Sequence, residues 1–381
     1  MAEVVIPQPA ATRTPDKLLG LEAVRFIAAL AVLIWHYRHF SYVGSAPVDL
    51  VMDRLPLYGL LHPFYEAGRS GVWIFWCVSG FIFFWRYRDS IAGCEVPGRT
   101  FFVLRLSRLY PLHVVTLIVV AALQAVYFHQ RGNFFVYQQN DVGHFVLQLF
   151  MASKWGLETG DSFNGPIWSI SVEVLVYITF FVMLRFATRS ALLNVVFILL
   201  CLNMHGQFFA CLGFFYAGGL AAIARRATAA AKYGGVIEAL GWGAAVTGFG
   251  LVWTSGRGLQ DIGWPFFMTL TPVLLYCISC RMRLPAFVQR LLEAAGNTTY
   301  SSYLLHFPLQ LLIAVGFAAA GYRIPFYETW FFVLFVGSTL LLSHLTYCYF
   351  EAPAQTFIRR TMLARSGAPR VAIDWAATPP R

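Results

Sequence analysis

The first apolar stretch of the chain carries two residues that are costly to bury in a membrane. "LEAVRFIAALAVLIWHYRHF", residues 21–40, places Arg25 and His36 eleven positions apart. At about 100° per residue, the two side chains lie within roughly 20° on one helix face, about 16 Å apart along it. Small residues lie near the line between them: Ala28, Ala29 and Val32. Such ionisable groups usually face a bundle interior or a wet cavity. The alternative is that Arg25 pairs with Glu22 at the interface and His36 reaches outward to solvent.

A pair of arginines begins another apolar run. In "FFVLRLSRLYPLH", residues 101–113, Arg105 and Arg108 are three positions apart and therefore share a helix face. Guanidinium forks match phosphate oxygens, so this face is a candidate phosphate site. The alternative is ordinary positive charge flanking a membrane span.

A carboxylate lies deep in a third stretch, "NGPIWSISVEVLVY", residues 164–177. Pro166 can open a helix, which places Glu173 about 12 Å below its outer end. Ser169 lies one turn away on the same face. Glu173 is the one acidic residue deep in any expected span, and such a residue is a candidate functional group. The alternative is a structural lock between Glu173 and a histidine or arginine of another helix.

A fourth stretch, "GNTTYSSYLLHFPL", residues 296–309, places His306 inside an apolar zone, and Pro308 is expected to kink the helix. The neighbouring hydroxyl residues are expected to bond across helices for packing. No histidines show metal-ligand spacing, so no metal site is predicted.

The elements that must position these residues are membrane helices. The 381 residues are 58% hydrophobic and 12% charged, against about a quarter charged in soluble domains. Apolar runs of ~20 residues recur along the chain, as in transmembrane helices. We therefore predict an all-α polytopic membrane bundle of about ten spans. The expected spans are 20–40, 66–86, 105–128, 166–186, 190–205, 207–224, 236–254, 262–280, 299–320 and 328–350.

The distribution of lysine and arginine orients this bundle. With the N-terminus in the cytoplasm, 20 of these residues lie in inner segments and 7 in outer ones, while Arg25 lies within a span. The positive-inside rule then predicts that both termini are cytoplasmic. The same rule explains the net charge of +10 without nucleic acid as a partner.

The predicted organisation has three parts. Residues 1–19 form a cytoplasmic N-terminal segment, 20–350 the transmembrane domain, and 351–381 a cytoplasmic tail that is partly disordered. In the outer loop 129–165, "HFVLQLFMA" is too short to span and is expected to be re-entrant or interfacial. The seven cysteines are expected to be reduced packing residues.

Taken in order, these motifs resemble the acyltransferase family 3 of integral membrane proteins. The matching motifs are the Arg25–His36 pair, "GVWIFWCVSGFIF", "RLSRLYP", "WSISVE" and "SYLLHFPL". They cover about residues 20–350. The resemblance implies a transferase that moves an acyl group, most often acetyl, from cytoplasmic acyl-CoA to a hydroxyl on the outer side. Acetyl-CoA is then a donor substrate, and no permanently bound cofactor is expected.

The resemblance also assigns roles to particular residues. His36 carries over as the catalytic histidine, with Arg25 essential to the same site. Arg105 and Arg108 carry over as the donor-binding pair, and the thiol arm of the donor is expected beside the small-residue stripe of the first span.

Three further positions are expected to contact substrate, and a fourth to assist His36. Trp168, Ser169 and His306 are the expected substrate contacts. Glu173 is expected in the outer half of the membrane with His36, where it could orient that histidine, fix its tautomer or hold the acceptor.

The expected acceptor is a glycan or lipid-linked saccharide, and the expected location is a bacterial inner membrane. Outer-loop side chains could bind a sugar or serve as interfacial anchors. These are Tyr137, Trp155, Asp161 and Phe163. The rival interpretation is a transporter or flippase for a surface-glycan intermediate, which should show matching broken halves. The sequence shows no such symmetry.

Overall fold

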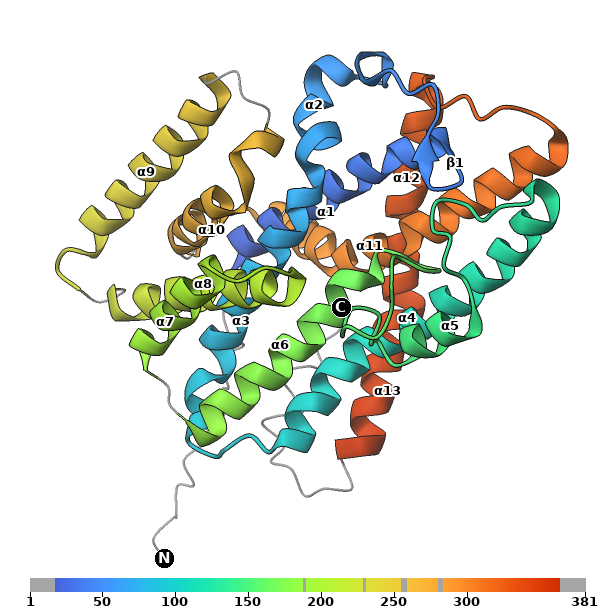
Figure 1. Ribbon diagram of the computed structural model, residues 1–381. Helices are drawn as coiled ribbons and strands as arrows, with labels where there is room; N and C mark the ends of the chain where they lie inside the picture. Colours follow the sequence, from blue (N-terminus) through green and yellow to red (C-terminus); the bar gives the residue numbers. More distant parts are fainter. Residues whose placement is uncertain (1–17, 188–189, 229–230, 255–258, 280–283, 364–381) are drawn as a thin grey trace, which may run out of the picture.

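The computed structural model describes residues 18–187, 190–228, 231–254, 259–279 and 284–363, and these are almost entirely helical (Figure 1). A single small hairpin pairs β1 (Tyr42–Val43) with β2 (Ala46–Pro47) in the described part of the chain. The helices are α1 (Leu19–Tyr37), α2 (Tyr58–Ala67), α3 (Gly71–Ala92), α4 (Gly98–Arg131), α5 (Val142–Leu149), α6 (Ile167–Phe186), α7 (Ala191–Leu202), α8 (Gln207–Thr228), α9 (Gly234–Thr254), α10 (Leu259–Ile278), α11 (Ala286–Ala320), α12 (Thr329–Thr346) and α13 (Ala352–Leu363).

Membrane-spanning character is confirmed. Among the described residues, seven helical segments are long and apolar enough to cross a bilayer. Two shorter apolar helices, Ala191–Leu202 and Pro265–Ile278, accompany them. Each of the ten expected spans overlaps one of the helices, so the all-α membrane bundle is correct. The count of ten spans and the cytoplasmic position of both termini stay predictions.

The apolar patch in the loop 129–165 forms α5, which at eight residues is too short to span. The side chain of Asp141 caps its start by accepting from the backbone N–H of His144 at 3.0 Å. The imidazole Nε2 of His113 in α4 bonds to the carbonyl of Gln148 at 2.7 Å, and the Gln148 amide donates to the carbonyl of Ser162. The loop is therefore fixed to α4 by buried polar contacts.

The first part of the predicted C-terminal tail is helical, and its partial disorder stays a prediction. A π-helical turn, Tyr347–Glu351, continues α12 directly into α13. This helix lies along α4, where Leu363 packs in a buried cluster with Val103 and Leu104 (Figure 1). The rest of the tail, 364–381, and residues 1–17 of the N-terminal segment lie outside the described residues.

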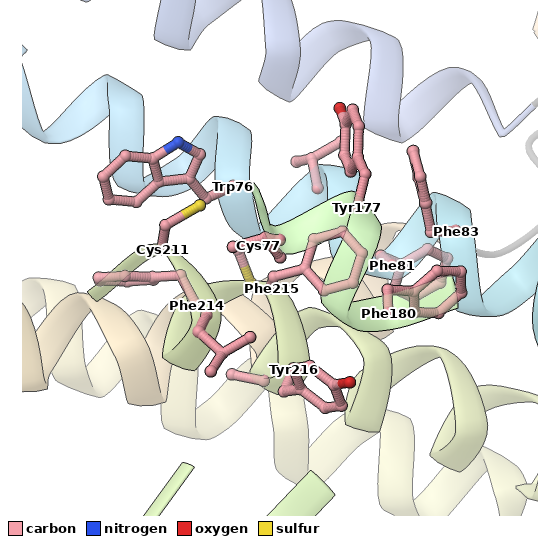
Figure 2. Packing of buried hydrophobic residues seen from close by; sticks show 14 of the residues in the cluster. Trp76, Cys77, Phe81, Phe83, Tyr177, Phe180, Cys211, Phe214, Phe215 and Tyr216 are labelled. Carbon is pink, nitrogen blue, oxygen red and sulfur yellow. The ribbon is translucent and has the colours of Figure 1, made fainter. Parts of the chain in front are cut away.

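The centre of the bundle is an aromatic core between α3, α6 and α8. Figure 2 shows Phe83 of α3 near Phe180 of α6 and Phe215 of α8, and Trp76 of α3 beside Cys211 and Phe214 of α8. Glycines allow α3 and α8 to approach this closely. A Cβ at Gly80 would overlap the carbonyl oxygen of Phe215, and other glycines of this interface are similarly crowded. Small residues let membrane helices pack backbone to backbone.

This contact gives a prediction about stability. We expect Gly80→Ala to lower the thermal stability of the detergent-solubilised protein, because the methyl would meet backbone and α3 and α8 would have to separate. Overpacking of this kind costs about 1–3 kcal/mol. Gly316→Ala in α11 is the matched control, since a Cβ there meets nothing within 4 Å. Equal melting temperatures for the two variants would contradict the close α3–α8 contact.

Candidate active site

Five helices surround a cavity of about 120 Å³ that carries three arginines, and we call it the arginine cavity. It lies against α1, α3, α4, α6 and α11, and apolar side chains of α3 form much of its wall. Its polar lining is Arg25, Ser79, Arg105, Arg108, Ser169, Glu173, Tyr177, Thr299, Tyr300 and Tyr303. Three guanidinium groups in one cavity make it suited to an anion.

Arg25 is held at the cavity by two bonds. Its Nη1 lies 2.7 Å from Oε2 of Glu22, and its Nη2 donates to Oγ1 of Thr299 at 2.9 Å. Gly296 of α11 leaves room for this carboxylate, because a Cβ there would overlap Glu22. The ion pair between Arg25 and Glu22, which was the alternative to a functional role for Arg25, is therefore present. The same guanidinium also lines the arginine cavity.

Arg105 and Arg108 both line the arginine cavity, as their shared helix face predicted. The Nη2 of Arg105 donates to the Tyr87 hydroxyl at 2.7 Å, and its guanidinium lies 4.8 Å from the centre of the Phe83 ring. The charge of Arg108 interacts with the carboxylate of Glu351. The aromatic contacts orient Arg105, whereas Arg108 interacts electrostatically with Glu351.

Glu173 lies in the arginine cavity, which corrects the expectation that it sits with His36. Its Oε1 accepts from the Tyr177 hydroxyl at 2.5 Å, one turn along α6. Its charge also interacts with Arg108 and Arg105. Depth along α6 was a poor guide, because the direction in which a helix faces decides its partners. We therefore assign Glu173 to the arginine side of the site.

A second pocket, the histidine pocket, contains His36. Residues of α1, α6 and the start of α8 surround it, together with β1, the 3₁₀ turns Arg38–Ser41 and Gly68–Ser70, and neighbouring loops. The lining residues are Trp35, His36, His39, Tyr42, Ser45, Arg69, Val136, Tyr137, Gln138, Gln139, Gly160, Asp161, Trp168 and Gln207. Of the four outer-loop candidates, Tyr137 and Asp161 line this pocket, Trp155 lines a separate groove, and Phe163 is buried in an apolar cluster.

The ring of His36 has a defined tautomer. Its Nδ1 lies 2.8 Å from the carbonyl oxygen of Val32. A carbonyl only accepts, so Nδ1 carries the proton, and Nε2 of the neutral ring is left as the acceptor. His36 is only 7% exposed, so the alternative that it reaches outward to solvent is wrong. The backbone of α1, and not Glu173, fixes this tautomer.

His306 of α11 packs directly on His36, with ring centroids 4.6 Å apart. Its Nδ1 lies 3.2 Å from the carbonyl of Ser302 and donates to it, and within the described residues its buried Nε2 has no hydrogen-bond partner. His39 contacts the other side of His36 at 4.9 Å. No group of three or more metal-ligating side chains in the described part of the chain is arranged to hold a metal ion.

The two cavities meet at one pair of contacting rings, and a second pair connects the arginine cavity to the ring that packs on His36. Trp76 lines the arginine cavity and contacts Trp168, a lining residue of the histidine pocket, at 5.7 Å between ring centroids. Tyr303 lines the arginine cavity and contacts His306 at 6.1 Å between ring centroids, whereas His306, expected as a substrate contact, is fully buried and is a lining residue of neither cavity. The hydroxyl of Ser169 lies 2.6 Å from that of Tyr303. Trp168 and Ser169, expected as substrate contacts, therefore face different cavities at their common wall.

The small-residue stripe of the first span does not border an open path. Ala28 and Val32 are buried against α3, and a Cβ at Gly71 would press on the carbonyl of Ala28 and the side chain of Val32. The stripe is a close helix contact, so the expectation that a thiol arm runs beside it is wrong. The open space lies on the other side of this contact, along α3.

Sequence reasoning missed Glu351. The side chain is 2% exposed and accepts a 2.6 Å bond from the Ser301 hydroxyl of α11. It lies one residue beyond the expected end of the last span, and the π turn carries the helix past that end without a break. The usable signal was a lone glutamate directly following the apolar run.

Comparison with known proteins identifies the family of the chain. The model of the acyltransferase 3 family, described as an acyltransferase domain, matches residues 18–348. The chain therefore belongs to this family of membrane acyltransferases. The acyltransferase MdmB of Streptomyces mycarofaciens is 28% identical over 171 residues, which are 43% of this chain and 38% of that protein. The match thus spans well under half of that relative. No solved structure matches the chain.

Proposed function

We propose that this protein is an O-acyltransferase that moves an acyl group, acetyl first, from acyl-CoA to a hydroxyl of an acceptor on the opposite membrane face. The observation that carries this proposal is the common wall between the arginine cavity and the histidine pocket. The ring pair Trp76–Trp168 separates the anion site from the pocket of the neutral imidazole, and Tyr303 of the anion site contacts His306, which packs on His36. A phosphate-bearing donor and a hydroxyl acceptor can then meet from two sides.

The donor occupies the arginine cavity in this proposal. Its phosphates bind Arg105 and Arg108, and Arg25 holds a phosphate or a polar part of the arm. The apolar wall that α3 supplies takes the methylene groups of the thiol arm. Glu173 and its partner Tyr177 then offer hydrogen bonds to the amides of that arm.

The acyl group is transferred at His36. Its Nε2 accepts the proton of the acceptor hydroxyl while the hydroxyl oxygen attacks the thioester carbonyl. A C–O bond forms, the C–S bond breaks, and the proton passes from the imidazolium to the leaving thiolate, which gives ester and free CoA. The alternative in which Nε2 itself attacks uses the same nitrogen and forms an acyl-histidine first.

The acceptor occupies the histidine pocket. Aromatic rings and amide groups line it together, as a polyhydroxylated ligand requires, and Trp168 and Tyr137 supply stacking faces. A glycan or lipid-linked saccharide fits this lining. With the positive-inside orientation, the pocket faces the outer side of a bacterial inner membrane, and the arginine cavity faces the cytoplasm.

Thioester consumption tests this function directly. We expect membranes that contain the protein to release free thiol from acetyl-CoA, and the release should rise when a hydroxylated acceptor is added from a panel of glycans. A transporter or flippase leaves the thioester intact. Thiol release that equals that of membranes without the protein, for every acceptor, would contradict the proposal.

A further inference from the structure

We propose that Arg359 of α13 is a positioning residue for the donor site, where it fixes the turn of α4 that carries Arg105 and Arg108. This inference rests on the proposed function, because it assumes that these arginines bind the phosphates of acyl-CoA. Arg359 lies outside residues 18–348 that the family model matches. In this proposal, α13, which follows the residues matched by the family model, contributes to the donor site.

Arg359 contacts Leu104 and Ser107, the residues that directly precede Arg105 and Arg108. Its Nε donates to the Ser107 hydroxyl at 3.0 Å, and its Nη2 lies 3.4 Å from the carbonyl oxygen of Leu104. The side chain is only 8% exposed. Ser107 Oγ also donates to the Leu104 carbonyl at 3.2 Å, so the three groups form one closed set of bonds.

This turn of α4 needs an outside support. Pro111 lies four residues after Ser107 and has no N–H to donate to the Ser107 carbonyl, so the helix is weakened where the arginines project. A proline in a helix also bends it. Arg359 braces that weakened turn through the Ser107 side chain and thereby holds the angle between Arg105 and Arg108.

The position of α13 is itself fixed. Glu351 anchors the preceding π turn to α11 through Ser301, and α13 then runs along α4 (Figure 1). At its far end Leu363 packs on Leu104, and Arg99 of α4 donates to the carbonyl of Met362 at 3.2 Å. Arg359 therefore approaches α4 from a helix held at both ends.

The electrostatics favour an anion at this place. Arg359 adds a further positive charge near Arg105 and Arg108, with which it interacts repulsively. Like charges gathered in one place are stabilised when a polyanion binds between them. The guanidinium of Arg359 bonds to Ser107 and Leu104 of α4. Its effect on donor binding therefore acts through the position of this α4 turn.

The test compares two neighbouring arginines of α13 in the full chain. Arg359→Met removes the brace, whereas Arg360→Met removes the same charge from an exposed position. Binding of CoA without an acyl group is measured by calorimetry in detergent, and the apparent KM for acetyl-CoA by thiol release. We expect Arg359→Met to weaken CoA about tenfold, the size of one lost hydrogen bond to a charged group. The kcat and the acceptor KM should stay unchanged.

The control outcomes separate this inference from the proposed function. Equal CoA affinity in Arg359→Met and Arg360→Met overturns the positioning role while the proposed function stands. A wild-type chain that binds no CoA overturns both. Because Arg359→Met could misfold, Ser107→Ala and Arg359→Lys enter the same assay. We expect Ser107→Ala to weaken CoA as Arg359→Met does and Arg359→Lys to recover part of the affinity; wild-type affinity in Ser107→Ala overturns the inference.

Discussion

Replacing His36 with alanine is expected to abolish acyl transfer while the protein stays folded in the membrane. The Nε2 of this ring is the proton acceptor in the proposed reaction, and its tautomer is set by the Val32 carbonyl. Loss of a positioned general base costs about 10²–10⁴-fold in rate. The rate of thiol release with an acceptor present measures the effect, and the melting temperature in detergent reports the fold.

The control for this variant is His129→Ala, which removes an exposed histidine near the end of α4. We expect it to keep wild-type activity. Wild-type rates in His36→Ala would remove His36 from the mechanism. If His36→Ala loses both activity and fold, His36→Gln is tested next, because it keeps much of the ring's volume and separates a catalytic from a structural role. A folded and active His36→Gln would likewise contradict the catalytic assignment.

Replacing Arg105 with alanine is expected to raise the apparent KM for acyl-CoA by about 10- to 100-fold, with a smaller change in kcat. The variant removes a guanidinium that the Tyr87 hydroxyl and the Phe83 ring hold at the arginine cavity. A hydrogen bond to a charged group contributes about 1.5–3 kcal/mol, which gives this range. Initial rates at varied acetyl-CoA concentration measure it.

Arg131→Ala is the matched control, since Arg131 is an exposed arginine at the other end of the same helix. It should leave the donor KM unchanged. An unchanged donor KM in Arg105→Ala would argue against phosphate binding in the arginine cavity. A raised acceptor KM would place the acceptor, and not the donor, beside Arg105.

Helix periodicity was sufficient to predict which face carries the arginine pair. Arg105 and Arg108 are three positions apart, and this spacing alone places them on one face of α4. The apolar runs likewise located the helices, because the cost of unsatisfied backbone groups in lipid forces such runs into helices. Local rules of this kind need no knowledge of neighbouring elements.

The partners of Glu173 could not be predicted in the same way. Its depth along α6 was read from the sequence, but the rotation of α6 about its axis is fixed by packing against α3 and α8. That rotation turns Glu173 toward Arg105 and Arg108 and sends Trp168 to the other pocket. Interhelical orientation depends on contacts between distant parts of the chain, which one sequence does not display.

The stripe of small residues and the end of the last span illustrate a similar ambiguity. Small residues permit either an open groove or a close helix contact, and Gly71 opposite Ala28 decides for the contact. Hydropathy places the end of a span where polar residues begin, so it left Glu351 outside. The π turn extends the helix past that point and carries the buried Glu351.

The most direct test of the account asks on which membrane face each substrate is used. The protein is reconstituted into sealed vesicles, its orientation is determined, and acetyl-CoA with a labelled acetyl group is confined to one side with the acceptor on the other. The account predicts labelled acceptor only when acetyl-CoA is on the face of the arginine cavity and the acceptor is on the face of the histidine pocket. Labelled acceptor formed only when both substrates share one face would contradict it.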